Sequence, residues 1–174
     1  MEISSSTGAP STGMSAAESG RTRRPTTMCN SHLRDWGNRL VFTNGCFDLL
    51  HAGHVWMLQF ARGLGDELIV GLNSDASVRR LKGPTRPIIP QDQRKFLLES
   101  LVYVTRVVIF DDSTPLALIR QLRPAVYVKG PEYRGVELPE ARLIVELGGR
   151  VVIPPRSPYG VSTREIVNAI RGAD

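Results

Sequence analysis

Cysteine is scarce in this sequence, and long apolar runs are absent. The two cysteines, Cys29 and Cys46, lie in different sequence contexts, so no disulfide framework is expected and the reducing cytoplasm is the predicted location. No apolar run approaches the roughly 20 residues that span a bilayer, and the N-terminus lacks the apolar centre of a signal peptide. We therefore predict a soluble, cytoplasmic protein with no membrane partner.

Lysine is also rare, with three lysines beside nineteen arginines in a chain of net charge +5. The positive residues are spread along the chain, whereas nucleic-acid binding usually needs a concentrated basic stripe with stacking aromatics. We therefore expect no nucleic-acid partner and favour a nucleotide as the anionic ligand. Lys82 and Lys129 precede glycines at predicted loops and are candidate ligand contacts, whereas Lys95 lies within a helical pattern.

The first 38 residues differ in composition from the rest of the chain. They are rich in Ser, Thr, Gly and Ala, and they show no sustained helical or strand period, which predicts a disordered N-terminal leader. An anion-binding arm is one role for residues 1–38, and a tolerated extension is the favoured alternative. Residues 39–174 have the length of one ordinary domain.

Short apolar runs alternate with helix-period segments from Arg39 onward, which is typical of βα units that build a parallel sheet. Each run is rich in Val, Ile or Leu, as expected for strands that helices cover on both faces. The fold predicted is α/β, a three-layer, doubly wound, Rossmann-like sheet of five parallel strands. The expected strands are Leu40–Thr43, Glu67–Leu72, Arg106–Phe110, Ala125–Val128 and Arg150–Ile153.

Helix boundary signals agree with this pattern. Thr114-Pro115 predicts a cap followed by proline at the first helical position, and Gly148-Gly149 predicts a helix end before the last strand. Ser162-Thr163-Arg164-Glu165 is a capping box at the start of the final helix. Apolar spacing predicts a further helix from Gln91 to Leu101.

The stretch from Leu40 to His54 joins an apolar strand, a glycine-containing turn and two histidines three residues apart. If a helix begins near Ala52, His51 and His54 lie on one face of its first turn, where free N–H groups and the helix dipole favour anions. From this spacing alone, phosphate binding is the favoured interpretation. Zinc binding and a purely structural pair remain as alternatives.

The surrounding residues resemble a known superfamily. Gly45-Cys46-Phe47-Asp48-Leu49-Leu50-His51-Ala52-Gly53-His54 resembles the signature of the HxGH nucleotidyltransferases, in their cytidylyltransferase-like branch. Within that branch the chain is most similar to the D-glycero-D-manno-heptose 1-phosphate adenylyltransferases, over roughly residues 39 to 172. The supporting segments, in the order the family has them, are Asn73-Ser74-Asp75, Arg80-Leu81-Lys82-Gly83, Arg86-Pro87, Gln93-Arg94, Val128-Lys129-Gly130 and Gly160-Val161-Ser162-Thr163.

The resemblance implies transfer of AMP from ATP to a phosphorylated sugar, with Mg²⁺ assisting and no covalent intermediate. It also implies a role for each matching residue. His51, His54 and Lys82 are the implied catalytic residues. Asn73, Asp75, Arg86 and Arg94 are the implied acceptor contacts, and Glu132 is the implied Mg²⁺ ligand. The implied nucleotide-binding residues are Thr43, Asn44, Gly45, Cys46, Phe47, Asp48, Gly53, Lys129, Gly130, Ser162 and Thr163.

Several of these residues have an alternative role. Asp48 is as well suited to ordering its own turn as to contacting a ligand. A salt bridge with another residue explains Arg94 as well as a contact with the acceptor does. Capping alone accounts for Ser162 and Thr163. Glu132 stands where relatives carry an aspartate, and Arg164 replaces a residue that is usually threonine, lysine or another polar residue.

The predicted product is therefore ADP-heptose, with pyrophosphate released. A cytidylyltransferase acting on glycerol 3-phosphate or a related alcohol phosphate is the alternative enzyme, and a nucleotide-binding regulatory protein is the alternative without turnover. The sequence leaves the choice between ATP, CTP and GTP open. Dimers are common in the family, so a homodimer is one expected form.

Overall fold

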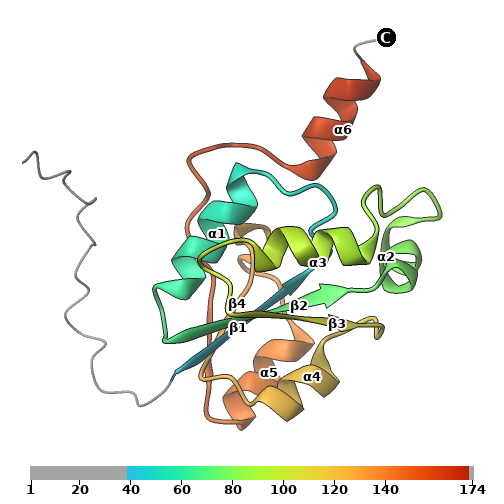
Figure 1. The fold of residues 1–174 in the computed structure, drawn as a ribbon. Helices are drawn as coiled ribbons and strands as arrows, with labels where there is room; N and C mark the ends of the chain where they lie inside the picture. Colours follow the sequence, from blue (N-terminus) through green and yellow to red (C-terminus); the bar gives the residue numbers. More distant parts are fainter. Residues whose placement is uncertain (1–38, 173–174) are drawn as a thin grey trace, which may run out of the picture. The chain divides into compact units, whose positions relative to one another are not determined.

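A computed structural model describes residues 39–172, which form one parallel sheet between two helical layers (Figure 1). The predicted leader lies outside the described residues. The strand order is β3-β2-β1-β4-β5 and every pairing is parallel, so the predicted doubly wound, Rossmann-like fold is confirmed. The strands are β1 Leu40–Gly45, β2 Glu67–Asn73, β3 Arg106–Phe110, β4 Val126–Val128 and β5 Arg150–Val152.

The strand order reverses direction between β1 and β4, because β2 and β3 lie on one side of β1, and β4 and β5 on the other. In open α/β sheets, ligands bind outside the carboxyl ends of the strands at such a switch point. The fold therefore places the end of β1, and the turn that leads from it to the His-x-Gly-His segment, at the expected ligand position.

Residues 39–172 also form six α-helices and one short 3₁₀ turn, and all but α6 lie between consecutive strands. α1 begins at Ala52 as predicted, and the Ser162 hydroxyl caps α6 by accepting a 3.3 Å hydrogen bond from the Glu165 N–H. The helices are α1 Ala52–Arg62, α2 Asp75–Lys82, α3 Gln91–Glu99, α4 Leu116–Leu122, α5 Pro139–Glu146 and α6 Thr163–Arg171, and the 3₁₀ turn is η1 Pro131–Tyr133.

Two predicted helix boundaries are wrong. Pro115 is the residue before α4 instead of its first residue, and no side chain caps that helix, so Thr114 is not the cap. α3 ends at Glu99, two residues before the expected end, because Ser100 and the following turn complete its last hydrogen bonds.

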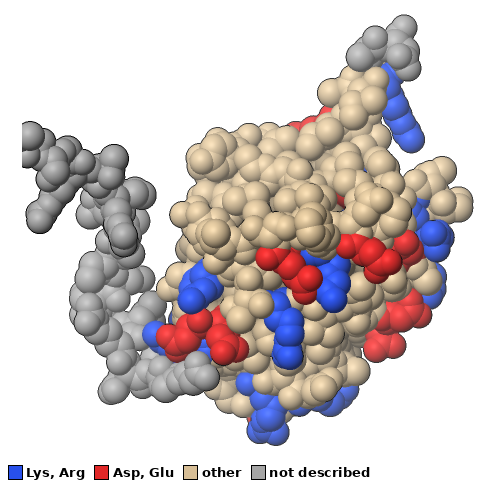
Figure 2. Space-filling view, viewed as in Figure 1, with Lys and Arg blue, Asp and Glu red and all other residues tan. Residues whose placement is uncertain are grey.

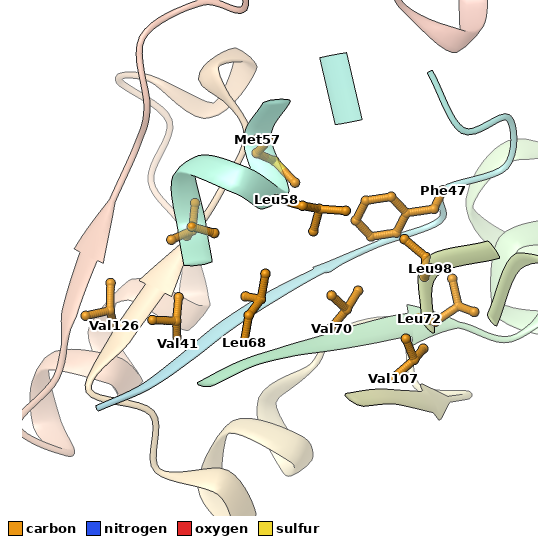
Figure 3. Close-up of a cluster of buried hydrophobic side chains, with 12 residues drawn as sticks. Val41, Phe47, Met57, Leu58, Leu68, Val70, Leu72, Leu98, Val107 and Val126 are labelled. Carbon is orange, nitrogen blue, oxygen red and sulfur yellow. The ribbon is translucent and has the colours of Figure 1, made fainter. Parts of the chain in front are cut away.

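The sheet has a separate apolar cluster on each face. Leu68, Val70 and Leu72 alternate along β2, so their side chains point to the same face, where they pack with Leu58 of α1 and Leu98 of α3 (Figure 3). On the opposite face, a second cluster joins the sheet to α4 and α5 through Phe42, Ile69, Tyr127, Ile119 and Ile144. Residues that alternate along the strands thus fix both helical layers and hold the strand ends in register.

The surface of the described residues carries both charge signs. Figure 2 shows Lys and Arg side chains interspersed with Asp and Glu on the face in view. No helix within residues 39–172 is long and apolar enough to cross a membrane.

Candidate functional site

A cavity of about 460 Å³ opens at the carboxyl edge of the sheet. It brings together most of the site residues predicted from the sequence. Those lining it are Asn44, Gly45, Cys46, Phe47, Asp48, His54, Asn73, Lys82, Lys129, Gly130, Glu132 and Thr163. Segments as far apart in the chain as Asn44 and Thr163 therefore meet at one site, as the doubly wound fold requires.

The two histidines lie at the start of α1. His51 is the residue before the helix, with φ −141°, and its carbonyl oxygen accepts a 2.9 Å hydrogen bond from the His54 N–H. Their imidazole rings stack, with centroids 3.8 Å apart and planes at 26°, and the Phe47 ring lies 5.1 Å from that of His54. The pair thus faces the helix N-terminus, where backbone N–H groups favour an anion.

Both histidines are held in the neutral form at neutral pH. Burial, with His51 and Lys82 nearby, lowers the pKa of His54 to about 4, while a backbone hydrogen bond at Leu49 acts in the opposite direction. Burial also lowers the pKa of His51, against the attraction of Glu165. Because a phosphate would favour the protonated form, binding an anion here should raise both values.

Gly53, between the two histidines, lies where the surrounding atoms leave little room for a side chain. A Cβ atom at this position would lie 3.1 Å from the His51 imidazole and 3.2 Å from the carbonyl oxygen of Val161. The missing side chain lets the segment before α6 approach the start of α1. That approach brings Thr163 to the cavity, whereas the Ser162 hydroxyl is engaged in capping α6.

Asp48 holds a loop to the turn after β1. It is 2% exposed, its Oδ2 pairs with Arg86 at 2.6 Å, and its Oδ1 accepts hydrogen bonds from Ile88 N at 2.6 Å and Ile89 N at 3.3 Å. These contacts tie the loop of residues 83–90, which follows Lys82, to the cavity wall. Asp48 thus orders a loop that is distant in the sequence instead of its own turn, and Arg86 takes part in the same contact.

Arg94 is buried among protein acceptors. Its Nη1 donates to the carbonyl oxygens of Cys46 at 2.6 Å and Asn73 at 2.9 Å. Its Nε donates to Ile89 O at 2.9 Å, and its Nη2 pairs with Asp75 Oδ1 at 2.7 Å. Since its side chain is 0% exposed, these contacts support the salt-bridge alternative, and Arg94 joins the ends of β1 and β2 to α3.

Lys129 lies on the β4 side of the cavity and is 7% exposed. Its Nζ donates to Asn44 Oδ1 at 3.1 Å and lies 4.7 Å from the centre of the Tyr133 ring. Burial lowers the pKa of Lys129, while the negative charges of Glu140 and Glu132 oppose that shift. The Asn44 amide oxygen also accepts a 2.6 Å hydrogen bond from Tyr127, so it links β1 to β4.

Thr43 lies in β1 just before the cavity. It is 1% exposed, and its Oγ1 has no hydrogen-bond partner within the described residues. Thr43 does not line the cavity wall, and neither do His51, Gly53 and Ser162. His51 stacks on His54, which does line the cavity.

A family model described as Cytidylyltransferase-like matches residues 42–169, which include most of β1 and all of β4, the strands that flank the switch point. The chain belongs to the cytidylyltransferase-like family. The recognition made from the His-x-Gly-His segment is therefore confirmed.

Relatives of this cytidylyltransferase-like chain include proteins named Bifunctional protein HldE. The one from Trichlorobacter lovleyi is 52% identical over 134 residues, which are 77% of this chain and 27% of the relative. The one from Streptomyces coelicolor is 51% identical over 143 residues, which are 82% of this chain and 31% of the relative. The chain thus spans about a quarter to a third of the length of these relatives.

Two solved structures have a similar fold. The lipopolysaccharide core biosynthesis protein from Thermoplasma volcanium is 28% identical, with a TM-score of 0.58 over 68% of this chain and 98% of that one. Pantothenate synthetase from Thermus thermophilus is 16% identical, with a TM-score of 0.53 over 74% of this chain and 61% of that one. At 16% identity, the similarity to pantothenate synthetase shows a shared fold and nothing further.

Sequence reasoning missed three polar residues of the cytidylyltransferase-like site. Tyr127 lies in the middle of β4, Tyr133 ends η1, and Glu140 lies in the first turn of α5. Tyr133 and Glu140 line the cavity, and Tyr127 supports its wall through Asn44. The only signal for Glu140 is a proline followed by an acidic residue, a pattern that an ordinary helix start explains completely.

Proposed function

We propose that this cytidylyltransferase-like domain transfers AMP from ATP to a heptose 1-phosphate and releases pyrophosphate. The observation that carries the proposal is the stacked His51 and His54 pair at the N-terminus of α1, of which His54 lines the cavity together with Lys82 and Lys129. The relatives named HldE favour ADP-heptose as the product over the glycerol 3-phosphate alternative.

The reaction is an in-line displacement at the α-phosphorus. An oxygen of the acceptor phosphate forms the new P–O bond, the bond from the α-phosphorus to the bridging oxygen breaks, and pyrophosphate leaves with that electron pair. Negative charge gathers on the phosphate oxygens, so catalysis consists mainly of positioning and electrostatic stabilisation. His51 and His54 would donate hydrogen bonds to those oxygens, and Lys82 and Lys129 would neutralise charge.

Mg²⁺ fits this site as a companion of the triphosphate. Residues 39–172 contain no group of three or more His, Cys, Asp or Glu side chains able to hold a metal ion. Magnesium usually keeps several waters and binds one or two carboxylates plus substrate phosphates, so such a cage is not required. Glu132 lines the cavity and is the carboxylate that would hold the ion, which when bound would neutralise phosphate charge.

The test is pyrophosphate release from four nucleoside triphosphates, each paired with heptose 1-phosphate or glycerol 3-phosphate. We expect release with ATP and heptose 1-phosphate to exceed every other pair. A preference for CTP with glycerol 3-phosphate would support the alternative enzyme. Nucleotide binding without release from any pair would contradict the proposal and favour a regulatory protein.

A further inference from the structure

The β4 side of the cavity differs in chemistry from the β2 side. Because β1 lies between β2 and β4, the residues at the two strand ends line opposite sides of the His54 position. Lys82 and Asn73 lie on the β2 side, whereas Glu132 and Glu140 lie on the β4 side. Two carboxylates thus line one half of a cavity that is built for phosphates.

Glu140 has the most unusual position of these residues. It is 6% exposed, it lines the cavity, and its Oε2 is buried with no hydrogen-bond partner within the described residues. A buried carboxylate without a partner for one oxygen costs stability, and removing such a group from a protein is usually neutral or favourable. The position of Glu140 in the first turn of α5 offsets only part of that cost.

Lys129 does not supply the missing partner. Its Nζ donates to Asn44 instead, and its Tyr133 contact is with the aromatic ring. The charge of Glu140 nevertheless acts on Lys129 more strongly than that of Glu132 does. The lysine therefore balances the charge of Glu140 at a distance and leaves Oε2 free to accept a hydrogen bond.

The ligand that satisfies Oε2 must supply a donor and cannot be a phosphate. An ionised carboxylate only accepts hydrogen bonds, and the oxygens of an ionised phosphate group have no proton to donate to it. Tyr133, Leu138 and Pro139 add apolar surface beside Glu140. Hydroxyl groups as donors, next to apolar surface that packs against C–H groups, are the features of a sugar ring.

We propose that Glu140 accepts hydrogen bonds from the hydroxyl groups of a sugar ring bound between β4 and α5. The inference rests on the proposed function, in which two such rings occur: the ribose of ATP and the acceptor heptose. Glu140 is then a specificity residue, because a ligand without those hydroxyls leaves the carboxylate buried and unpaired.

The test is calorimetric binding of ATP, 2′-deoxy-ATP, 3′-deoxy-ATP and heptose 1-phosphate to wild type and to E140Q. We expect E140Q to weaken binding of the ring-bearing ligand about 10- to 100-fold. If E140Q binds ATP more weakly and discriminates less against the deoxy nucleotides, the ring that Glu140 contacts is the ribose. If E140Q binds only heptose 1-phosphate more weakly, that ring is the acceptor heptose. The matched control is E146Q, an exposed position at the other end of α5, where no change is expected.

Unchanged affinities for every ligand in a folded E140Q protein would overturn the inference. If E140Q does not fold by thermal melting, E140D replaces it, because it keeps the charge but shortens the reach. Binding by wild type without pyrophosphate release would contradict only the proposed function. If the wild type binds neither ATP nor heptose 1-phosphate, both proposals are overturned.

Discussion

Arg94 donates a 2.6 Å hydrogen bond to the carbonyl oxygen of Cys46, 48 positions away in the sequence. The same guanidinium reaches Asn73 at the end of β2 and Asp75 at the start of α2, so one buried side chain joins two strand ends that line the cavity. Lysine has a single ammonium group and cannot reproduce the several hydrogen bonds that the planar guanidinium donates in different directions.

The first prediction concerns Arg94. R94K should lower the free energy of unfolding by about 3 kcal/mol, because a single ammonium cannot reach all the buried acceptors of Arg94 and leaves some of them without a donor. Urea unfolding measures this change. R120K, on the exposed face of α4, is the control and should be near neutral. A change below about 0.5 kcal/mol for R94K would show that the contacts carry no net stability.

The second prediction concerns the ion pair that holds the loop of residues 83–90. D48N should lower the free energy of unfolding by about 3 kcal/mol, because Arg86 is left partly buried without its carboxylate. E99Q removes the exposed Lys95–Glu99 pair and should cost no more than about 0.5 kcal/mol. Equal costs for the two variants in urea unfolding would refute the loop-anchoring role of Asp48.

The third prediction concerns catalysis by His54. H54A should lower kcat by about 10²–10³, because one donor to the developing charge is lost. Steady-state pyrophosphate release measures the rate, and the melting temperature shows whether the variant is folded. Q59A, exposed on the same helix, should keep normal turnover. Near-normal turnover by H54A would exclude His54 from the chemistry.

The fourth prediction is a pH dependence of stability. The pKa of His54 is lowered from 6.5 to about 4 in the folded protein, so between these values the unfolded chain binds more protons. Stability should therefore fall as the pH drops through this window, by about 2 kcal/mol between pH 7 and pH 5. Urea unfolding of wild type and H54N at both pH values isolates this contribution. An identical pH dependence in both proteins would contradict the buried, neutral state of His54.

The fold could be predicted because its signals are local. Runs such as Glu67–Leu72 show strand composition within a few residues, and the box at Ser162 marks a helix start by itself. The predicted position of the histidines followed in the same way, since a three-residue spacing at a helix start places both rings on one face.

The contacts of Asp48, Arg94 and Glu140 could not be predicted, because each depends on partners that only the fold brings near. Nothing around Arg94 indicates that its partners are Cys46 and Asn73, 48 and 21 positions away. Glu140 has an ordinary helix-start sequence, and only the packing of α5 on the sheet buries it. The contacts of these three residues therefore depend on segments that are distant in the sequence and adjacent in the fold.

The central claim is that the acceptor phosphate attacks the α-phosphorus of ATP. The most direct measurement incubates the wild-type protein with heptose 1-phosphate and ATP that carries a radioactive label at either the α- or the γ-phosphate. We predict that the α-label appears in the nucleotide sugar and the γ-label in pyrophosphate. Transfer of the γ-label to the sugar, or release of labelled inorganic phosphate without labelled sugar, would contradict nucleotidyl transfer.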